Sequence, residues 1–531
     1  MYYVDKTLLL ADILGNNLRG VYLYTRPRRF GKTTNLSMLD AFFNIQYKGN
    51  TWFDGLKISE YPEYAQYKNA FPVIRLDLKD TVASNNKTFM NRVRSAIAEA
   101  YHDHMYLLDS ELDETDAILF RKVLSKETSD DYVPDCIRDL CRLLNKYHGR
   151  RAIILIDEYD RAVADSFGDA AHRKSMDSLG TILSSALKSN PHLQLAYITG
   201  IMQIAKENIF SGLNNLRVNN ILSRESDERF GFTESEVKEL LSYYGRSDEF
   251  DVVKTWYDGY RFGDAEVYNP YSIMYYTSSP DEPLPYWANT AKDVAIEWLL
   301  DKVDMKTFSN IMSLVNGGSI DIKLNVTQTY EDLKRDIKSV YNLMVLSGYL
   351  KAIPKGDGSY EVSIPNKEVM TIVNEKMWNL NLIDDGTYNE FNIAVLDGDS
   401  EKAVRILQSV LKDASYLTLN DEHDYQLVMM TIMHTLSRAY SIRTEYEAGN
   451  GRLDMILTPR REGMTPLIFE LKKVDSEREL DGAVENAIAQ IHERRYYLDM
   501  SGEVILFGIA FWSKIPKGRS ERILVRNGTL V

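Results

Sequence analysis

A short loop near the N-terminus constrains the fold of this chain more than any other feature. Residues 21–24 form a β-prone apolar run, and residues 35–43 space their apolar side chains as one face of a helix. The loop between them contains Arg26, Pro27, Arg28, Arg29, Phe30, Gly31, Lys32, Thr33 and Thr34. A strand, a glycine-lysine loop and a helix in this order predict one unit of a parallel sheet.

This loop matches most of the P-loop pattern, Gly-x-x-x-x-Gly-Lys-Ser/Thr. In that pattern backbone N–H groups surround phosphates, the lysine reaches the β- and γ-phosphates and the hydroxyl contacts Mg²⁺. Gly31, Lys32 and Thr33 fit, whereas Arg26 takes the place of the first glycine. We expect the extra arginines to contact phosphate directly or to act on the charge of the γ-phosphate.

A second feature, a pair of acidic residues, supports a nucleotide site. The apolar run 152–156 ends in Asp157 and Glu158. Asp157 can hold Mg²⁺ through its water shell, and Glu158 can orient and deprotonate an attacking water. Thr199, at the end of the next apolar run, is a candidate sensor of the γ-phosphate. The plainer alternative is an ordinary strand-to-helix turn, a solvated strand end and a threonine that only packs in its strand.

The pattern along the chain predicts an α/β protein of several domains. Apolar runs at 71–78, 151–156 and 193–199 alternate with helical stretches at 89–101 and 137–147, which is typical of a parallel sheet covered on both faces. From Thr233, which forms a capping box with Glu236, helical patterns take over. We expect a P-loop domain at 1–229, a helical, winged-helix-like middle domain at 230–385 with a short strand at 360–364, and a compact α/β domain at 386–531.

The C-terminal part contains a second candidate site. A Met-rich helix is expected at 426–440, strands at 442–446, 452–457, 467–471 and 504–511, and a helix at 480–498. Asp454 and Glu470 lie on neighbouring strands, and Glu470 and Lys472 share a face because they are two residues apart. The two acids could bind Mg²⁺ with the carbonyl oxygen of Leu471, and Lys472 could position a water or stabilise phosphodiester charge.

The alternative for this second site is an ordinary cross-strand set of charged surface residues without catalytic function, because an acid and a lysine two residues apart on an exposed strand face are common. Glu422 could supply another acid, and Gln490 and Tyr496 lie where they could support the site. The aromatic segment at 256–263 could stack on bases, but a packed turn at a domain junction is the interpretation we favour.

Composition limits the partners. The formal net charge of −14 argues against a protein that coats nucleic acid non-specifically. In the C-terminal part acidic and basic side chains are nearly equal in number, so this part can approach a polyanion more easily. The sequence contains no apolar run long enough to span a bilayer and does not begin like a signal peptide, so we expect no membrane association and a cytoplasmic location.

Several segments together resemble the AAA-ATPase-like family of bacteria and archaea. They are residues 3–7, the Arg-Pro-Arg-Arg-Phe-Gly-Lys-Thr loop, and residues 156–160, 210–215, 256–260 and 268–272. Members typically end in a domain of the PD-(D/E)xK nuclease superfamily, whose motifs match residues 451–454, 469–472 and 489–496 in order. The resemblance implies that arginine at position 26 is a family trait.

We therefore expect an ATP-regulated nuclease. ATP and Mg²⁺ would bind between Lys32 and Asp157, Glu158 would assist hydrolysis, and Asp454, Glu470, Lys472 and Gln490 would serve Mg²⁺-dependent cleavage of DNA or RNA. One alternative is a regulatory ATPase whose C-terminal domain binds nucleic acid or protein without cleaving it. Another is a P-loop that binds nucleotide without turnover. A homo-oligomer is possible, because an arginine from a neighbouring subunit often completes such sites.

Overall fold

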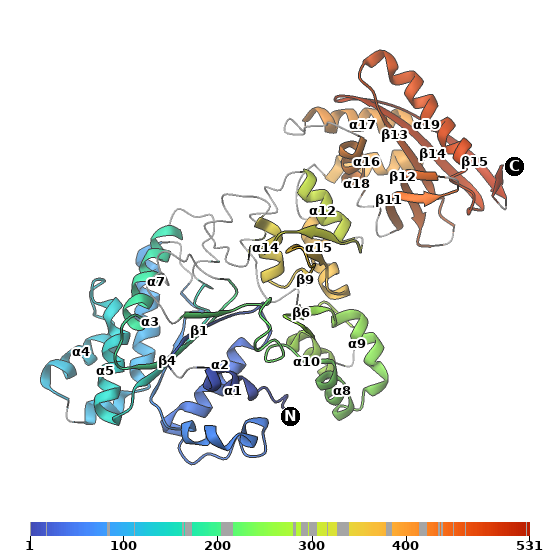
Figure 1. Cartoon of the computed structure of the whole chain (residues 1–531). Helices are drawn as coiled ribbons and strands as arrows, with labels where there is room; N and C mark the ends of the chain where they lie inside the picture. The colour runs from blue at the N-terminus through green and yellow to red at the C-terminus, as the bar shows by residue number, and fades with distance from the viewer. Residues whose placement is uncertain are drawn as a thin grey trace. The chain divides into compact units, whose positions relative to one another are not determined.

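The computed structural model (Figure 1) describes residues 2–16, 19–81, 85–110, 112–161, 164, 172–202, 216–279, 283–287, 296, 305–315, 317–325, 339–378, 385–413, 422–433, 436, 439–449, 451–461, 463–526 and 528–530. The chain divides into two compact units, Met1–Val303 with Ser313–Met377 (unit 1) and Asp304–Met312 with Trp378–Val531 (unit 2). The three-domain division stays a prediction, and its first boundary falls inside unit 1. Residues 210–215, which contribute to the family resemblance, lie outside the described residues.

Unit 1 contains a five-stranded parallel sheet in the order β2-β3-β4-β1-β5. Its strands are β1 (Val21–Thr25), β2 (Val73–Asp77), β3 (Ala152–Asp157), β4 (Leu193–Gly200) and β5 (Leu216–Asn219). All residues of β1 and β3 are buried, as expected for a parallel sheet with both faces covered. Four of the five strands were predicted from the sequence. The short β5, whose middle residues are exposed, was missed.

Helices cover both faces of this sheet. α2 (Lys32–Phe43) packs against β2, β3 and β4, whereas α3 (Asn86–His102) contacts β2 and α5 (Cys136–His148) contacts β3. In Figure 1, α3, α5 and α7 (His172–Leu187) lie on one side of the sheet, and α1 (Leu8–Asn16) and α2 lie on the other. Because β4 pairs with both β1 and β3, the end of β4 lies between the P-loop and the acidic end of β3.

The described residues of unit 1 after position 230 are mainly helical, as predicted. Thr233 caps α8 (Glu234–Tyr243), and both hydrogen bonds of the expected capping box with Glu236 are present. A hairpin of β6 (Tyr260–Phe262) and β7 (Ala265–Val267) follows α9 (Phe250–Tyr257). The predicted short strand is β10 (Tyr360–Ser363), which pairs with β8 (Ile320–Ile322) and β9 (Lys351–Pro354) in a small antiparallel sheet.

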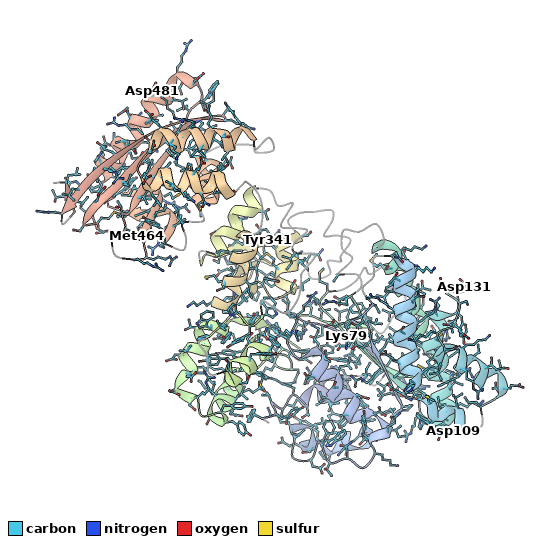
Figure 2. All side chains as sticks on the ribbon, turned by 180° about the vertical axis from the view of Figure 1, so that it is seen from behind. Lys79, Asp109, Asp131, Tyr341, Met464 and Asp481 are labelled. Carbon is cyan, nitrogen blue, oxygen red and sulfur yellow. The ribbon has the colours of Figure 1, made fainter. Side chains whose placement is uncertain are left out.

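The remaining elements have these bounds. The helices are α4 (Glu114–Leu124), α10 (Pro270–Ser278), α12 (Met305–Val315), α14 (Ser339–Leu346), α15 (Lys367–Trp378), α16 (Asp385–Leu396), α17 (Ser400–Asp413), α18 (Glu422–Met433) and α19 (Leu480–Arg494). Short 3-10 helices are η1 (Ile45–Tyr47), η2 (Lys57–Glu60), η3 (Pro62–Tyr67), η4 (Met105–Asp109), η5 (Val133–Asp135), η7 (Ser247–Glu249) and η10 (Glu477–Glu479). Figure 2 shows the side chains from behind, with Tyr341 on α14 and Asp481 in the first turn of α19.

Unit 2 contains a six-stranded sheet in the order β11-β12-β13-β14-β15-β16. The strands are β11 (Tyr440–Ala448), β12 (Gly451–Pro459), β13 (Leu467–Lys473), β14 (Gly502–Trp512), β15 (Ile515–Arg526) and β16 (Thr529–Leu530). Only β13 and β14 are parallel, and α19 connects them. One apolar cluster includes side chains of α16, α17 and α18, and a second includes side chains of α19. Helices therefore pack on both faces of the sheet.

Two predicted helices in unit 2 are too long at their C-terminal ends. The Met-rich helix ends at Met433, and Tyr440 is already the first residue of β11, where it pairs with Pro459. The helix expected to reach residue 498 ends at Arg494, because Arg495 adopts a left-handed conformation with φ of 51°. The long antiparallel strand β15 was also missed. Within the described ranges, no helix is long and apolar enough to cross a membrane.

Candidate functional site

The P-loop turn places Gly31 directly before α2. Gly31 has a φ of 78°, in the left-handed region that glycine adopts without strain, and it serves as the N-cap of the helix. The first backbone N–H groups of α2 therefore point toward the loop, and the helix dipole favours an anion there. Thr33 and Thr34 lie exposed in the first turn. This local geometry suits a phosphate group.

Lys32 lies inside the loop and is buried. Its ammonium group donates hydrogen bonds to the carbonyl oxygens of Arg26 at 3.0 Å and Pro27 at 2.9 Å. Burial lowers the pKa of Lys32 to about 8, against the opposing charges of Glu158, Asp160 and Asp157. The lysine is therefore held between the loop backbone and the acidic end of β3.

Asp157 brings three predicted residues together. Its carboxylate accepts a hydrogen bond from the Thr33 hydroxyl at 2.6 Å and another from the Thr199 hydroxyl. The backbone N–H of Glu158 also donates to it, at 3.1 Å. Thr33 and Asp157 are the pair expected to hold Mg²⁺, and their contact supplies hydroxyl and carboxylate oxygens, the donor chemistry that this hard cation prefers.

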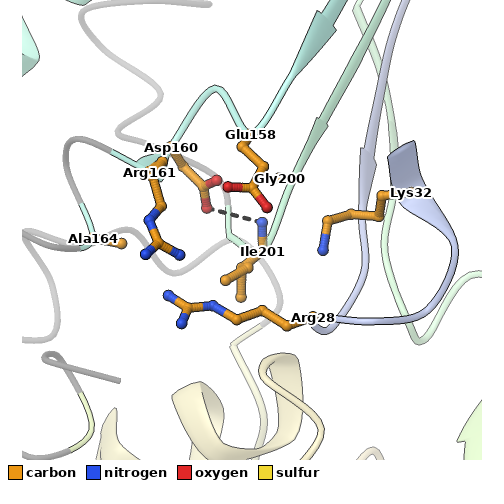
Figure 3. A pocket seen from close by; sticks show the side chains of 8 residues that line it. All are labelled: Arg28, Lys32, Glu158, Asp160, Arg161, Ala164, Gly200 and Ile201. Carbon is orange, nitrogen blue, oxygen red and sulfur yellow. Dashed lines mark hydrogen bonds between the residues drawn. The ribbon is translucent and has the colours of Figure 1, made fainter. Parts of the chain in front are cut away.

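Glu158 faces a small pocket beside Lys32 (Figure 3). Its backbone has a φ of 48°, an uncommon conformation for a residue other than glycine. Burial raises the pKa of Glu158, opposed by the positive charges of Lys32 and Arg161. The pocket is lined by Arg28, Lys32, Glu158, Asp160, Arg161, Ala164, Gly200 and Ile201. A carboxylate with a raised pKa is a stronger proton acceptor, as a general base requires.

Asp160 and Arg161 are pocket residues that the sequence analysis did not select. Asp160 is buried and accepts hydrogen bonds from the backbone N–H groups of Ile201 and Met202, both at 2.9 Å. These bonds tie the turn after β3 to the chain after β4. A Cβ atom on Gly200 would come within 2.7 Å of Asp160, so only glycine fits at this position. Asp160 belongs to the segment 156–160, which contributes to the family resemblance, so the sequence did contain a signal that could have identified it.

Arg26 does not occupy the role that we expected for its side chain. Its guanidinium is fully buried and donates to the carbonyl oxygen of Thr25 at 2.9 Å, the carbonyl oxygen of Asn219 at 3.1 Å and Asn219 Oδ1 at 2.6 Å. It also lies over the rings of Phe230, at 4.6 Å, and Phe262, at 5.4 Å. The predicted direct contact of this side chain with phosphate is therefore corrected, because the guanidinium is already enclosed by protein. Its backbone carbonyl still contributes by holding Lys32.

The neighbouring loop residues attach the P-loop to the helical part of unit 1. Phe30 is buried, with its ring 4.9 Å from those of Tyr260 and Phe262 on β6. The guanidinium of Arg29 lies 4.5 Å from the ring of Tyr271. Pro27 packs so closely on the turn after α14 that a Cβ atom on Gly348 would come within 2.9 Å of it. The aromatic segment 256–263 thus contains a packed turn, as we favoured.

In unit 2, Asp454 lies where two strands stop pairing. The pairing between β12 and β13 ends at the pair Met455 and Phe469. Beyond that pair, the carboxylate of Asp454 accepts a hydrogen bond from the backbone N–H of Leu471 at 2.7 Å. The amide of Gln426 on α18 donates to Asp454 Oδ1 at 3.1 Å. Burial raises the pKa of Asp454.

Glu470 and Lys472 share one face of β13, as the strand period predicts. The ammonium group of Lys472 donates to Glu470 Oε1 at 2.8 Å. Glu470 is only 1% exposed, and burial together with the charge of Asp454 raises its pKa to about 7. Burial lowers the pKa of Lys472, but the hydrogen bond and charge of Glu470 outweigh that effect and raise it. The pair is thus a buried carboxyl beside a charged lysine.

The carboxylates of Asp454 and Glu470 have the donor chemistry that a divalent cation requires, although two side chains are a small set of ligands. Glu470 Oε2 is buried and has no hydrogen-bond partner among the described residues. A buried carboxylate oxygen without a partner costs free energy, which a bound cation would offset. The described ranges hold no group of three or more His, Cys, Asp or Glu side chains that could bind a metal. A carbonyl such as that of Leu471, or water, would have to complete the shell around Asp454 and Glu470.

The supporting residues proposed from the sequence fall into two groups. Gln490 donates to the Tyr496 hydroxyl at 3.2 Å, and this hydroxyl donates to the backbone carbonyl of Arg452 at 2.7 Å. They thereby link α19 to the start of β12, two residues before Asp454. Glu422 accepts a hydrogen bond from the backbone N–H of Lys473 at 3.1 Å. Direct participation of Gln490 in catalysis stays a prediction.

Comparison with protein families assigns both ends of the chain. Residues 1–210 match the AAA-ATPase-like family, described as a predicted AAA-ATPase, and residues 420–517 match the PD-(D/E)XK nuclease superfamily. The chain therefore carries an AAA-ATPase-like domain at its N-terminus and a PD-(D/E)XK domain near its C-terminus. These matches confirm the resemblance and the fold class predicted from the sequence.

Among individual proteins, the chain is similar to an uncharacterized protein in the vnfD 5' region of Azotobacter chroococcum mcd 1. The two are 26% identical over 386 residues, which cover 71% of this chain and 66% of the relative, slightly under two thirds of its length.

Two solved structures also align, the Aeropyrum pernix ORC2 protein and the Drosophila ORC bound to AT-rich DNA and Cdc6. They show 10% and 8% identity and TM-scores of 0.22 and 0.18. The alignments cover 70% and 69% of this chain, and 92% and 89% of the chains of the two solved structures. Similarities this weak carry no argument about fold or function.

Proposed function

Starting from a chain that joins an AAA-ATPase-like domain to a PD-(D/E)XK domain, we propose that the protein hydrolyses ATP and cleaves nucleic acid with Mg²⁺. The observation that carries the nuclease half is the group of Asp454, Glu470 and Lys472, in which one buried oxygen of Glu470 has no hydrogen-bond partner in the described part of the chain. We further propose that the nucleotide bound in unit 1 controls cleavage by unit 2. The alternative, a C-terminal domain that binds nucleic acid or protein without cleaving it, is an outcome of the experiment below.

In the nucleotide site, each residue has a defined task. The N-terminus of α2 and the Lys32 ammonium bind the phosphates. Thr33 and Asp157 would hold a Mg²⁺ ion, which would supply positive charge to offset that of the β- and γ-phosphates. Thr199 fixes the Asp157 carboxylate through its hydrogen bond. Glu158, which lines the pocket, would orient the attacking water and accept its proton, which its raised pKa favours.

In unit 2, Asp454 and Glu470 would hold a divalent cation, which supplies positive charge for a phosphodiester transition state. The Leu471 N–H and the Gln426 amide orient the Asp454 carboxylate. Lys472 stays protonated because its pKa is raised, so it can stabilise negative charge on the scissile phosphate. The near balance of acidic and basic side chains in the C-terminal part is compatible with approach of a polyanion.

The nuclease proposal is tested by incubating the full chain with supercoiled plasmid and with single-stranded RNA in Mg²⁺. We expect cleavage of at least one substrate by the wild type and its loss in Asp454→Asn. Glu401→Gln is the matched control, because Glu401 is an exposed acid at the start of α17. No cleavage with ATP, with ADP or without nucleotide would favour a domain that binds only. Equal cleavage under all three conditions would remove the proposed control by ATP.

The ATPase half is tested by phosphate release. Glu158→Gln removes the proposed base while keeping the shape of the side chain, so we expect turnover to fall about 100-fold or more. Glu99→Gln on α3 is the control, since Glu99 is exposed and outside the pocket. If wild type and Glu158→Gln release phosphate equally slowly while both bind ATP, the P-loop binds nucleotide without turning it over.

A further inference from the structure

Two arginines of one chain enter the pocket beside Lys32. Arg28 comes from the P-loop, and Arg161 follows the turn after β3. Figure 3 shows both guanidinium groups extending into the same part of the pocket, below Glu158 and Asp160. Residues 133 positions apart in sequence therefore bring like charges to one place, an arrangement that suits an anion.

The charges around the pocket also favour an anion. Its lining contains the cations Arg28, Lys32 and Arg161 against the two acids Glu158 and Asp160. Asp160 already accepts two backbone N–H groups, from Ile201 and Met202, so part of its charge is stabilised by the backbone. Among the lining residues the cations therefore outnumber the acids by one. Asp157, whose charge also acts on Lys32, lies outside the lining and is the proposed ligand of Mg²⁺, so the arginines remain to attract a phosphate.

The position of the pocket identifies which phosphate it would receive. A P-loop lysine reaches the β- and γ-phosphates, and the acid after the strand orients water on the far side of the γ-phosphate. Lys32 and Glu158 both line this pocket, so the space between them belongs to the terminal phosphate rather than to the nucleoside. By contrast Arg29, the next residue in the loop, lies over the ring of Tyr271 and is absent from the pocket lining.

We propose that Arg28 and Arg161 bind the γ-phosphate and make the site select nucleoside triphosphates over diphosphates. This inference rests on the proposed nucleotide site and adds Arg161, together with the specificity of the pair. Guanidinium groups bind phosphate oxygens through two parallel N–H bonds, which gives both affinity and orientation. Since both arginines belong to the same chain, this selectivity does not require a second subunit.

The experiment compares two nucleotides on the full chain. Binding of AMP-PNP and of ADP, each with Mg²⁺, is measured by titration calorimetry for wild type, Arg28→Ala and Arg161→Ala. We expect each substitution to weaken AMP-PNP by about 10- to 100-fold, the loss of a charge-assisted hydrogen-bond pair, and to change ADP by less than about threefold. Arg121→Ala is the control for loss of one positive charge, because Arg121 is exposed on α4.

The outcomes separate this inference from the proposed function. If the wild type binds neither nucleotide, the nucleotide site itself is wrong. If the wild type binds both nucleotides, and the alanine variants keep both affinities or lose both affinities equally, only the γ-phosphate assignment is overturned. Arg28→Lys and Arg161→Lys guard against misfolding, because they keep the charge and should restore part of the AMP-PNP affinity. Failure of both lysine variants to improve on alanine, in proteins that still bind ADP like the wild type, would also overturn it.

Discussion

Introducing the usual first glycine of the P-loop should lower the stability of this protein. Arg26→Gly would give the loop its general form, and a phosphate-binding role for Arg26 predicts a loss of nucleotide affinity alone. The structure predicts a loss of stability instead, because the guanidinium holds the end of β1 to Asn219 on β5 and fills a space beside Phe230 and Phe262. Its pKa, lowered by burial to about 10, still leaves it charged at neutral pH.

The size of the effect follows from the contacts. Removing the guanidinium leaves three buried carbonyl oxygens without this donor, two on Asn219 and one on Thr25. Breaking a buried cluster in this way costs about 3–5 kcal/mol, including the cavity left by the side chain. Arg26→Met keeps much of the volume among the aromatic rings but makes no hydrogen bonds, so we expect a smaller loss of about 1–3 kcal/mol.

Hydrogen exchange measured by mass spectrometry on the full chain is the suitable assay, because the two units need not unfold together. Peptides that cover β1 and β5 report on the sheet of unit 1. If their exchange requires unfolding of that sheet, a loss of about 3 kcal/mol accelerates it by roughly 150-fold. Peptides from β13 and β14 in unit 2 serve as the internal control and should not change.

One result would refute the reasoning. If Arg26→Gly exchanges like the wild type in β1 and β5 but binds ATP much more weakly, Arg26 acts on phosphate and its buried position is not what stabilises the sheet. Equal losses of stability in Arg26→Gly and Arg26→Met would instead assign the whole effect to the hydrogen bonds.

Three further predictions concern other parts of the chain. Binding of Mn²⁺ to unit 2, followed by electron paramagnetic resonance, should strengthen about tenfold from pH 6 to pH 8, because the Glu470 carboxyl, with a pKa of about 7, must lose its proton to bind metal. Glu470→Gln should abolish this pH dependence, and an affinity of the wild type that does not change with pH would contradict the prediction. Thr199→Val should slow ATP turnover about fivefold to tenfold by freeing the Asp157 carboxylate, with unchanged ADP binding as the check on folding. Gly449→Ala should lower the urea midpoint of unit 2, at a cost of about 1–3 kcal/mol, because Gly449 has a φ of 54° and a Cβ atom would come within 2.3 Å of the Arg495 carbonyl oxygen; an unchanged midpoint would count against this backbone arrangement.

Much of both candidate sites could be predicted from the sequence, because their signals are local. Gly31, Lys32 and Thr33 follow one another at a strand-to-helix turn, whose geometry depends on a few neighbouring dihedral angles. Glu470 and Lys472 share a face because a strand repeats every two residues. The approach of Asp157 to Thr33 was also predictable, since the carboxyl ends of parallel strands meet at one edge of a sheet.

Only the tertiary structure decided where the other side chains lie. The position of Arg26 depends on Asn219, Phe230 and Phe262, which are about 200 residues away or more along the chain. The convergence of Arg28 and Arg161 depends likewise on how the turn after β3 faces the P-loop. These contacts join segments that are distant in sequence, and no periodicity or local motif records them. The loop between residues 26 and 34 therefore identified the site, whereas packing determined which of its arginines can reach a nucleotide.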